Sequence, residues 1–385
     1  MNQYRLRISL LILTCALTPC IKGLGNSPEK TYAQSQAVVI EKTNHLQSAK
    51  ETETPKKPSP ILESSFGASL TAGKYLLPAK EGWWNWGMAP IYDEAGKLHI
   101  FNSSIPYIGE HGMGNWSKRS IIQHFVADSI EGPFELVGVP FRSNQTTYHN
   151  PQVTQVGDTY VLVYLMNDPS TSAASQAVGI ATAQSLYGPW TESPHNPVIR
   201  PSRAPGTHNA THASNPTFLV DREGKFRIYY KSISDQKSGF RTIALATADT
   251  VLGPYEDYAH NPLISYADIG RDIEDPYAFF YRDTYYMILE DRMDVKGALE
   301  GDPYPKERIQ RGGNRPGLFY TSKDGLDWGR PETSYNTNTH YFEGEPLSRS
   351  ERPHILWKDG KPEYLFLANH GSEAAGYYLK IGDWE

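Results

Sequence analysis

The sequence predicts an all-β protein built as a five-bladed β-propeller. A short turn that ends in proline opens an extended segment five times, at intervals of 60 to 77 residues. Each segment leads to a second strand and then to a third, and no long stretch shows the periodicity of a helix. Repeats of this kind are typical of propellers, whose blades bury their faces only by stacking on neighbours. The five turns are Ala89-Pro90, Asn150-Pro151, Asn215-Pro216, Asp275-Pro276 and Arg352-Pro353.

The remaining strands follow each turn in a fixed order. A turn that carries Gly or Asp separates the first strand from the second. The second strands are expected at Lys97–Phe101, Thr159–Tyr164, Lys225–Tyr230, Thr284–Leu289 and Glu363–Leu367. The third strands are expected to end at Phe134, Trp190, Tyr255, Trp328 and Trp384. Five such units predict five blades.

The last blade lacks sequence for an outermost strand. Its third strand, Gly376–Ile381, ends within a few residues of the C-terminus. Because an unpaired sheet edge invites aggregation, we expect another segment to cover it. Residues 66–77 are the segment expected to supply that strand, and they would fasten the first blade to the last.

The N-terminal segment is typical of an export signal. Arg5 and Arg7 precede an apolar stretch that is shorter than a membrane span, so we expect a signal peptide over residues 1–21 and a secreted or periplasmic protein. The segment Leu17–Cys20 loosely resembles a lipoprotein box, which makes a lipid anchor at Cys20 an open alternative. Residues 22–65 are polar and are expected to form a flexible linker, followed by a catalytic propeller over residues 66–385.

Composition excludes some classes of partner. The net charge is −6 and no basic stripe is present, so the sequence gives no indication of nucleic-acid binding. An anionic polysaccharide would need a local basic patch. Aromatic residues make up 12% of the chain, which suits strands and sugar-stacking surfaces alike. No cofactor is expected, and no close spacing of His and Asp around His149 supports a metal site.

The residues before the five prolines are the first candidates for a functional site. The innermost strands of a propeller line its central channel, so these positions converge although they are distant in sequence. Asn or Asp before Pro is ordinary turn chemistry, but the charged residues and the histidine exceed what a turn needs. One residue before the proline stand Ala89, Asn150, Asn215, Asp275 and Arg352. Two residues before it stand Met88, His149, Ser214, Glu274 and Glu351.

On these residues the chain resembles the five-bladed enzymes of glycoside hydrolase family 43 and relatives such as family 117. The resemblance covers about residues 80–385 and rests on the blade count, the Gly-Pro-aromatic segments, and the acidic turns Glu274-Asp275-Pro276 and Glu351-Arg352-Pro353. It implies that Glu274 or Glu351 is a general acid and that Asp275 is a second catalytic carboxylate. The first blade departs from the family, because Ala89 stands where a base Asp is expected.

Glycoside hydrolysis needs one carboxyl group that is protonated and one that is ionised. Glu274 and Asp275 are adjacent and would point in different directions along a strand. We therefore favour Glu274 and Glu351, from neighbouring blades, as the catalytic pair. A purely structural role of these acids in ion pairs at blade ends is the alternative.

Further residues are predicted to bind the sugar. Trp84, Trp86 and His111 lie around the first blade, where aromatic rings could stack on sugars or pack in the core. His149, Asn150 and Asn215 offer hydrogen bonds to hydroxyl groups, with turn capping as the alternative. Arg352 is expected either to hold a neighbouring carboxylate ionised or to bind an acidic sugar, and Arg292 is a further substrate-binding candidate.

These observations predict a secreted glycoside hydrolase that acts on plant or algal poly- or oligosaccharides. The resemblance implies an inverting enzyme, whose carboxyls would lie about 6.5–9.5 Å apart, and we expect exo action. One alternative is a propeller glycoside phosphorylase, for which Arg292, Arg352 and His354 are the suggestive basic set. The other is a carbohydrate-binding propeller without catalysis.

Overall fold

The computed structural model describes residues 58–77, 82–107, 112–171, 173–236, 239–301, 316–336, 350–370 and 374–384. All of them belong to one compact unit, residues 55–385. The expected signal peptide, Cys20 and most of the expected linker lie outside the described residues. Within the described ranges, the helices are too short or too polar to cross a membrane.

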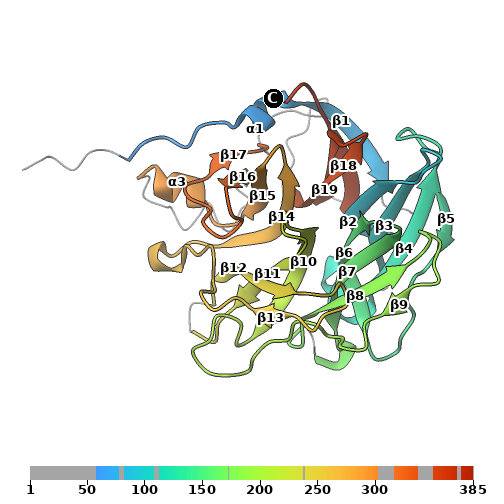
Figure 1. Ribbon diagram of the computed structural model, residues 1–385, viewed down its shortest axis with the longest axis horizontal. Coiled ribbons are helices and arrows are strands. Elements are labelled where there is room, and N and C mark those ends of the chain that lie inside the picture. The colour runs from blue at the N-terminus through green and yellow to red at the C-terminus, as the bar shows by residue number, and fades with distance from the viewer. Residues whose placement is uncertain are drawn as a thin grey trace, which may run out of the picture. The chain divides into compact units, whose positions relative to one another are not determined.

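In the part of the chain that the structure describes, twenty strands form five antiparallel sheets of four strands, which are arranged as the blades of a propeller (Figure 1). The predicted all-β, five-bladed fold is therefore confirmed. The first three blades are β2 (Trp83–Tyr92), β3 (Leu98–Pro106), β4 (Ile121–Ala127) and β5 (Glu135–Gly138); β6 (Thr147–Val156), β7 (Thr159–Asn167), β8 (Ala177–Ala183) and β9 (Thr191–Glu192); and β10 (His212–Val220), β11 (Phe226–Ile233), β12 (Arg241–Ala248) and β13 (Glu256–Asp257).

The last two blades are β14 (Ile273–Tyr281), β15 (Thr284–Asp291), β16 (Gly317–Ser322) and β17 (Glu332–Thr333); and β18 (Ser350–Lys358), β19 (Lys361–His370), β20 (Ala374–Ile381) and β1 (Leu70–Leu77). The described helices are short: α1 (Ser65–Ser69), α2 (Trp116–Arg119), α3 (Val295–Leu299), η1 (Gly112–Asn115), η2 (Pro169–Thr171) and η3 (Ala267–Ile269).

The third strands end earlier than the sequence indicates. The strand β4 ends at Ala127, before the segment Gly132–Phe134, and β8 and β12 likewise end before their Gly-Pro-aromatic segments. Each of these segments lies in the turn between the third strand and the short fourth strand. The aromatic residue of such a segment therefore marks the turn, because its ring packs on the blade without adding a pair to the ladder.

The hydrophobic core lies between the blades. Each of the five main buried clusters joins side chains of two neighbouring sheets. In the cluster between the fourth and fifth blades, Phe66 stacks on Phe319 and meets the ring of Trp384 edge-on, each with ring centres 5.1 Å apart. Because no blade buries both faces alone, the blades depend on one another for stability.

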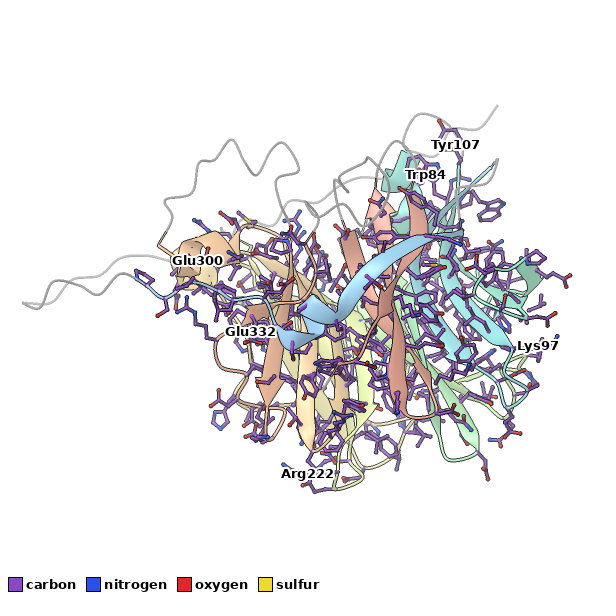
Figure 2. The ribbon with its side chains drawn as sticks, turned by 90° about the horizontal axis from the view of Figure 1, so that it is seen from above. Trp84, Lys97, Tyr107, Arg222, Glu300 and Glu332 are labelled. Atoms are coloured by element: carbon purple, nitrogen blue, oxygen red, sulfur yellow. The ribbon has the colours of Figure 1, made fainter. Side chains whose placement is uncertain are left out.

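The N-terminal strand closes the ring of blades as predicted. The strand β1 pairs antiparallel with β20, in a register that places Leu70 opposite Ile381 and Tyr75 opposite Tyr377 (Figure 2). The described residues also include a few that precede the expected boundary at Phe66. Glu63 forms a bridge with Thr333 of the fourth blade, and the Ile61 backbone N–H donates to Glu300.

We predict that removal of β1 strongly destabilises the protein. A chain that begins at Gly82 loses the buried side chains of Leu70, Leu76 and Leu77 and exposes the edge of β20. Burial of one such side chain contributes about 1.5–3 kcal/mol, so the melting temperature should fall by roughly 10 °C or more. A chain that begins at Pro58 is the control and should melt like the full-length protein. Equal melting temperatures of the two truncated chains would disprove the closure by β1.

Two histidines are buried in the blade interfaces. His124 lies against Phe101, with ring centres 4.3 Å apart, and its Nε2 is 2.9 Å from Nδ1 of His99. His354 lies 5.1 Å from the ring of Tyr277. Burial lowers the pKa of each to about 3, assisted by His99 for His124 and by Arg352 for His354. Both rings are therefore neutral in the folded protein at neutral pH.

These histidines predict a loss of stability on mild acidification. Their folded pKa values lie below the unfolded value near 6.5, so their contribution is complete above pH 6.5 and falls as the pH decreases toward 3. At pH 5 each histidine should lower the free energy of unfolding by about 2 kcal/mol relative to pH 7. Urea unfolding at both pH values measures the change, and His124→Gln should reduce it by about that amount. An unchanged pH dependence in this variant would contradict the assignment.

Candidate functional site at the mouth of the central channel

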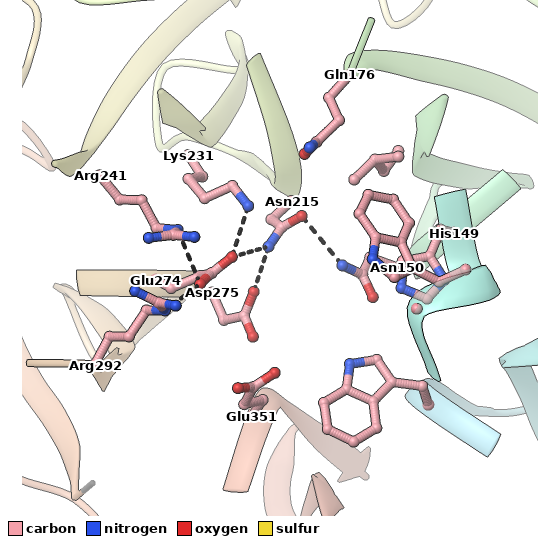
Figure 3. A pocket seen from close by; sticks show the side chains of 14 residues that line it. His149, Asn150, Gln176, Asn215, Lys231, Arg241, Glu274, Asp275, Arg292 and Glu351 are labelled. Atoms are coloured by element: carbon pink, nitrogen blue, oxygen red, sulfur yellow. Dashed lines mark hydrogen bonds and ion pairs between the residues drawn. The ribbon is translucent and has the colours of Figure 1, made fainter. Parts of the chain in front are cut away.

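The five inner strands meet around a cavity of about 320 Å³ at one end of the channel (Figure 3). Residues from all five blades line it, together with residues of the η1–α2 segment. The lining side chains include most of the predicted site residues. They are Trp86, Trp116, His149, Asn150, Leu165, Gln176, Asn215, Lys231, Arg241, Glu274, Asp275, Arg292 and Glu351.

A β-bulge in each inner strand directs one residue toward the channel axis. The residues before proline in the second to fifth blades all have left-handed backbone conformations, with φ of 50° at Asn150, 49° at Asn215, 57° at Asp275 and 54° at Arg352. Such values are costly for residues other than glycine. In the first blade the bulge lies between Trp86 and Met88.

The first-blade equivalent is therefore Gly87, and the expectation that Ala89 takes this place is wrong. Gly87 has φ of 55°. It has no side chain, so it makes no side-chain contact with the other bulge residues. A Cβ atom there would lie 3.0 Å from the side-chain oxygen of Asn150 and 3.5 Å from Cγ of Arg352. The place of a first-blade carboxylate is thus occupied by the arginine of the fifth blade.

Arg352 is buried below the cavity and does not line it. Its side chain is 1% exposed, and its Nη1 lies 3.4 Å from Oδ1 of Asp275. Its backbone N–H donates to Oδ2 of the same carboxylate at 3.1 Å, and Nη2 donates to the carbonyl of Asn150 at 3.4 Å. Burial lowers the pKa of Arg352, and Asp275 opposes this effect. The prediction of direct substrate binding by Arg352 is corrected, because the guanidinium group is enclosed and holds Asp275.

Two asparagines continue this network. The side-chain amide of Asn150 donates to Oδ1 of Asn215 at 3.1 Å. The amide of Asn215 then donates to Asp275 at 2.5 Å and to Glu274 at 3.3 Å. Both asparagines are buried, so their amide groups position the carboxylates and offer little to a bound hydroxyl group.

Glu274 lies at the centre of a cationic cluster on one wall of the cavity (Figure 3). Its carboxylate is 2.6 Å from Nζ of Lys231, 3.0 Å from Nε of Arg241 and 3.2 Å from Nε of Arg292. Burial alone would raise the pKa of Glu274, but Arg241, Lys231 and Arg292 together hold it well below its usual range. Glu274 is therefore ionised, which does not suit the expected role of a general acid.

Glu351 belongs to a different electrostatic environment. Carboxylate oxygens of Asp275, Glu290 and Glu351 all lie within 4.8 Å of one another, and the three side chains are buried. Among the described residues these form the one acidic group close enough to hold a metal ion. Figure 3 shows the carboxyl group of Asp275 between those of Glu274 and Glu351 in this view. Repulsion among three adjacent buried carboxyls favours protonation of one of them, and the positive charge of Arg352, which pairs with Asp275, acts against it.

An aromatic wall faces the ionic network. The ring of Trp116 stacks on His149 with centres 5.1 Å apart, and Nδ1 of His149 is 2.7 Å from Oγ of Ser120. Burial, with Arg352 and Lys231, lowers the pKa of His149 to about 3, so its ring is neutral. Trp86 completes this wall. Apolar rings beside a hydrogen-bonding imidazole suit the face and edge of a sugar ring.

Two predicted aromatic-wall residues are not placed there. Trp84 does not line the cavity, because it packs against Tyr107 with ring centres 5.5 Å apart. His111 lies outside the described residues. The phosphate set Arg292, Arg352 and His354 is not brought together either, since only Arg292 reaches the cavity.

Sequence reasoning missed several residues of the site. Lys231 and Arg241 stand on second and third strands. Glu290 lies opposite Glu274 in the ladder between β14 and β15. Pairing the first and second strands in register would have found Glu290, because residues opposite each other share a sheet face.

No protein-family model matches the chain, and no curated protein matches it. Solved structures with a similar fold include a family 117 glycoside hydrolase of the marine bacterium Zobellia galactanivorans, with 18% identity, a TM-score of 0.55, and coverage of 82% of this chain and 92% of that chain. A family 43 β-xylosidase/α-arabinofuranosidase from a compost microbial metagenome, in complex with xylotriose, has 14% identity, a TM-score of 0.51, and coverage of 80% and 94%. The resemblance drawn from the sequence is thus confirmed at the level of the fold.

The pair of Arg352 and Asp275 predicts a strong coupling in stability. Arg352→Met leaves a buried carboxylate without its cation and should cost about 3–5 kcal/mol of unfolding free energy. The double variant Arg352→Met/Asp275→Asn should cost clearly less than the sum of the two single changes. Urea unfolding of the four proteins gives the coupling. Additive effects would show that the two side chains do not depend on each other.

Proposed function

We propose that this protein is a glycoside hydrolase whose active site is the cavity at the channel mouth. The observation that carries this proposal is the contrast between two carboxyl groups that line it. Glu274 is held ionised by three cations, whereas Glu351 lies within a cluster of buried carboxyls. Two carboxyls in environments that favour opposite protonation states are what acid–base glycoside cleavage requires. The fold likeness to enzymes of families 117 and 43 supports the same function.

Within this proposal, Glu351 is the general acid. Asp275 is held by hydrogen bonds from Arg352 and Asn215, and Glu290 does not line the cavity. Glu351 is then the member of the cluster that can carry the proton and reach the substrate. It donates this proton to the glycosidic oxygen as the bond to the sugar breaks.

Glu274 takes the role of the ionised partner. It supplies the charge that the first blade lacks at Gly87, and it orients the water that attacks the sugar carbon from the opposite face. The water loses its proton to the carboxylate, so the products are the free sugar and the shortened chain. This arrangement is an inverting one, in which a water molecule fits between the carboxylate and the sugar. The strong cationic environment makes Glu274 a weak base, so we expect a modest turnover.

The shape of the cavity supports exo action on a chain end. Its volume of about 320 Å³ is at the lower limit of typical ligand pockets. The walls formed by Trp86, Trp116 and His149 would hold a terminal sugar by stacking and hydrogen bonding. We propose plant or algal poly- or oligosaccharides as substrates, a choice supported by the marine source of one structural neighbour and the xylotriose bound to another.

We also propose that the protein acts outside the cytoplasm. The basic and apolar pattern of residues 1–21 supports export, either as a secreted or periplasmic protein or with a lipid at Cys20. Cell fractionation with and without a Cys20→Ala change would separate the two forms. An extracellular location would suit a polymeric substrate that cannot enter the cell.

The assignment of the acid predicts a specific loss of activity. On any oligosaccharide cleaved by the wild type, Glu351→Gln should lower turnover by about 10²–10⁴-fold, because it keeps the shape but cannot donate the proton. The melting temperature should change little. Glu135→Gln, at an exposed position on β5, is the matched control and should leave turnover unchanged.

The measurement is product release from a panel of oligosaccharides, with the anomer of the product identified by NMR. Wild-type turnover in Glu351→Gln would show that Glu351 is not the general acid. Sugar binding without any product, in the wild type, would instead support a carbohydrate-binding propeller.

A further inference from the structure

One wall of the cavity carries more positive charge than its own carboxylates balance. Lys231, Arg241 and Arg292 converge there, and the carboxylates that pair with them are Glu274 and Asp272. Over the described residues that form these ion pairs, three cations meet two anions. These direct ion pairs contain one more cation than carboxylates, although the neighbouring Asp275, Glu290 and Glu351 add negative charge and the chain as a whole has a net charge of −6.

The two arginines are fixed from behind and open toward the cavity. Asp272 is 2% exposed and binds Nη1 of Arg241 at 2.6 Å and Nη1 of Arg292 at 2.8 Å. Glu274 lies against the Nε atoms of both. The Nη2 atoms form no hydrogen bond with other described residues, and the two side chains are 23% and 28% exposed. Guanidinium groups held in this way are preorganised to bind an oxyanion in two-point fashion.

This wall adjoins the carboxyls assigned to cleavage. The amide of Asn215 contacts both Glu274 and Asp275, and Asp275 is within 4.8 Å of Glu351. A positive excess on one side and a carboxyl cluster on the other give the cavity an internal polarity. A sugar with one anionic substituent would be oriented by this polarity, with its charged group toward the arginines and its glycosidic bond toward Glu351.

We propose that the sugar bound in this cavity carries a carboxylate or a sulfate ester, which Lys231, Arg241 and Arg292 bind. This inference rests on the proposed hydrolase function, whose substrate class it specifies. It assigns specificity to a local basic patch on an otherwise acidic protein. An anionic group can accept charge-assisted hydrogen bonds from the Nη2 atoms of both arginines, and these bonds are stronger than those to a neutral hydroxyl group.

The test measures binding separately from cleavage. Glucuronate, galacturonate and galactose 6-sulfate are titrated against the Glu351→Gln protein by calorimetry, with glucose and galactose as neutral counterparts. The anionic sugars should bind at least about 10-fold more tightly, and the difference should shrink as salt is added.

Arg292→Gln and Arg241→Gln should each weaken anionic-sugar binding by about 10–100-fold and weaken neutral-sugar binding by clearly less. Arg292→Lys preserves the charge and serves if the glutamine variant does not fold. It should lose part of the affinity, because it lacks the planar fork. Arg200→Gln, at an exposed arginine that does not line the cavity, is the matched control.

The outcomes separate this inference from the hydrolase proposal. Equal affinity for neutral and anionic sugars, with cleavage of neutral oligosaccharides that is insensitive to the arginine variants, overturns the anionic specificity and leaves the hydrolase standing. Arginine-dependent binding of anionic sugars without cleavage of any oligosaccharide supports the anionic-sugar site and contradicts the proposed hydrolase function. Cleavage that requires inorganic phosphate and releases a sugar phosphate overturns the anionic-sugar assignment, because the wall then binds the attacking phosphate.

Discussion

The buried guanidinium group of Arg352 is the interaction on which the centre of the molecule depends. Removing an arginine from water costs several kcal/mol unless its charge and donors are satisfied. Here Asp275 of the fourth blade balances the charge and the carbonyl of Asn150 in the second blade accepts a hydrogen bond. Gly87 in the first blade leaves the space for the side chain. One residue of the fifth blade thus bonds to the second and fourth blades and packs beside the first.

The pairing of Arg352 with Asp275 is one part of the charge distribution around the cavity. Arg352 pairs with Asp275, whereas Lys231, Arg241 and Arg292 pair with Glu274, and the two arginines also pair with Asp272. Asn215 spans the two groups and fixes their separation. The cavity therefore presents an ionised carboxylate on one side and a crowded carboxyl cluster on the other.

The sequence was sufficient to predict the fold but only part of the site. Proline turns and strand spacing report the repeat, and the short C-terminal blade predicts closure by residues 66–77, because both are local features of the chain. The environment of Glu274 is not local. Its cations come from β11, β12 and the end of β15, and neither strand alternation nor residue spacing shows which of these side chains face the same cavity. For this reason the sequence allowed either Glu274 or Glu351 as the general acid and gave no basis for a choice between them.

The bulges explain why the fold can carry such a site. Each inner strand needs a residue at positive φ to re-aim the chain, and glycine would satisfy that need at the lowest cost. Four of the five blades instead place Asn, Asp or Arg there, at a cost of about 1–3 kcal/mol each. The side chains recover this energy through hydrogen bonds and ion pairs along the axis. Only Gly87 follows the purely structural solution, and it does so where a Cβ atom would lie 3.0 Å from the side-chain oxygen of Asn150. Strain is therefore concentrated where the blades meet, and the residues that bear it are those that shape the cavity.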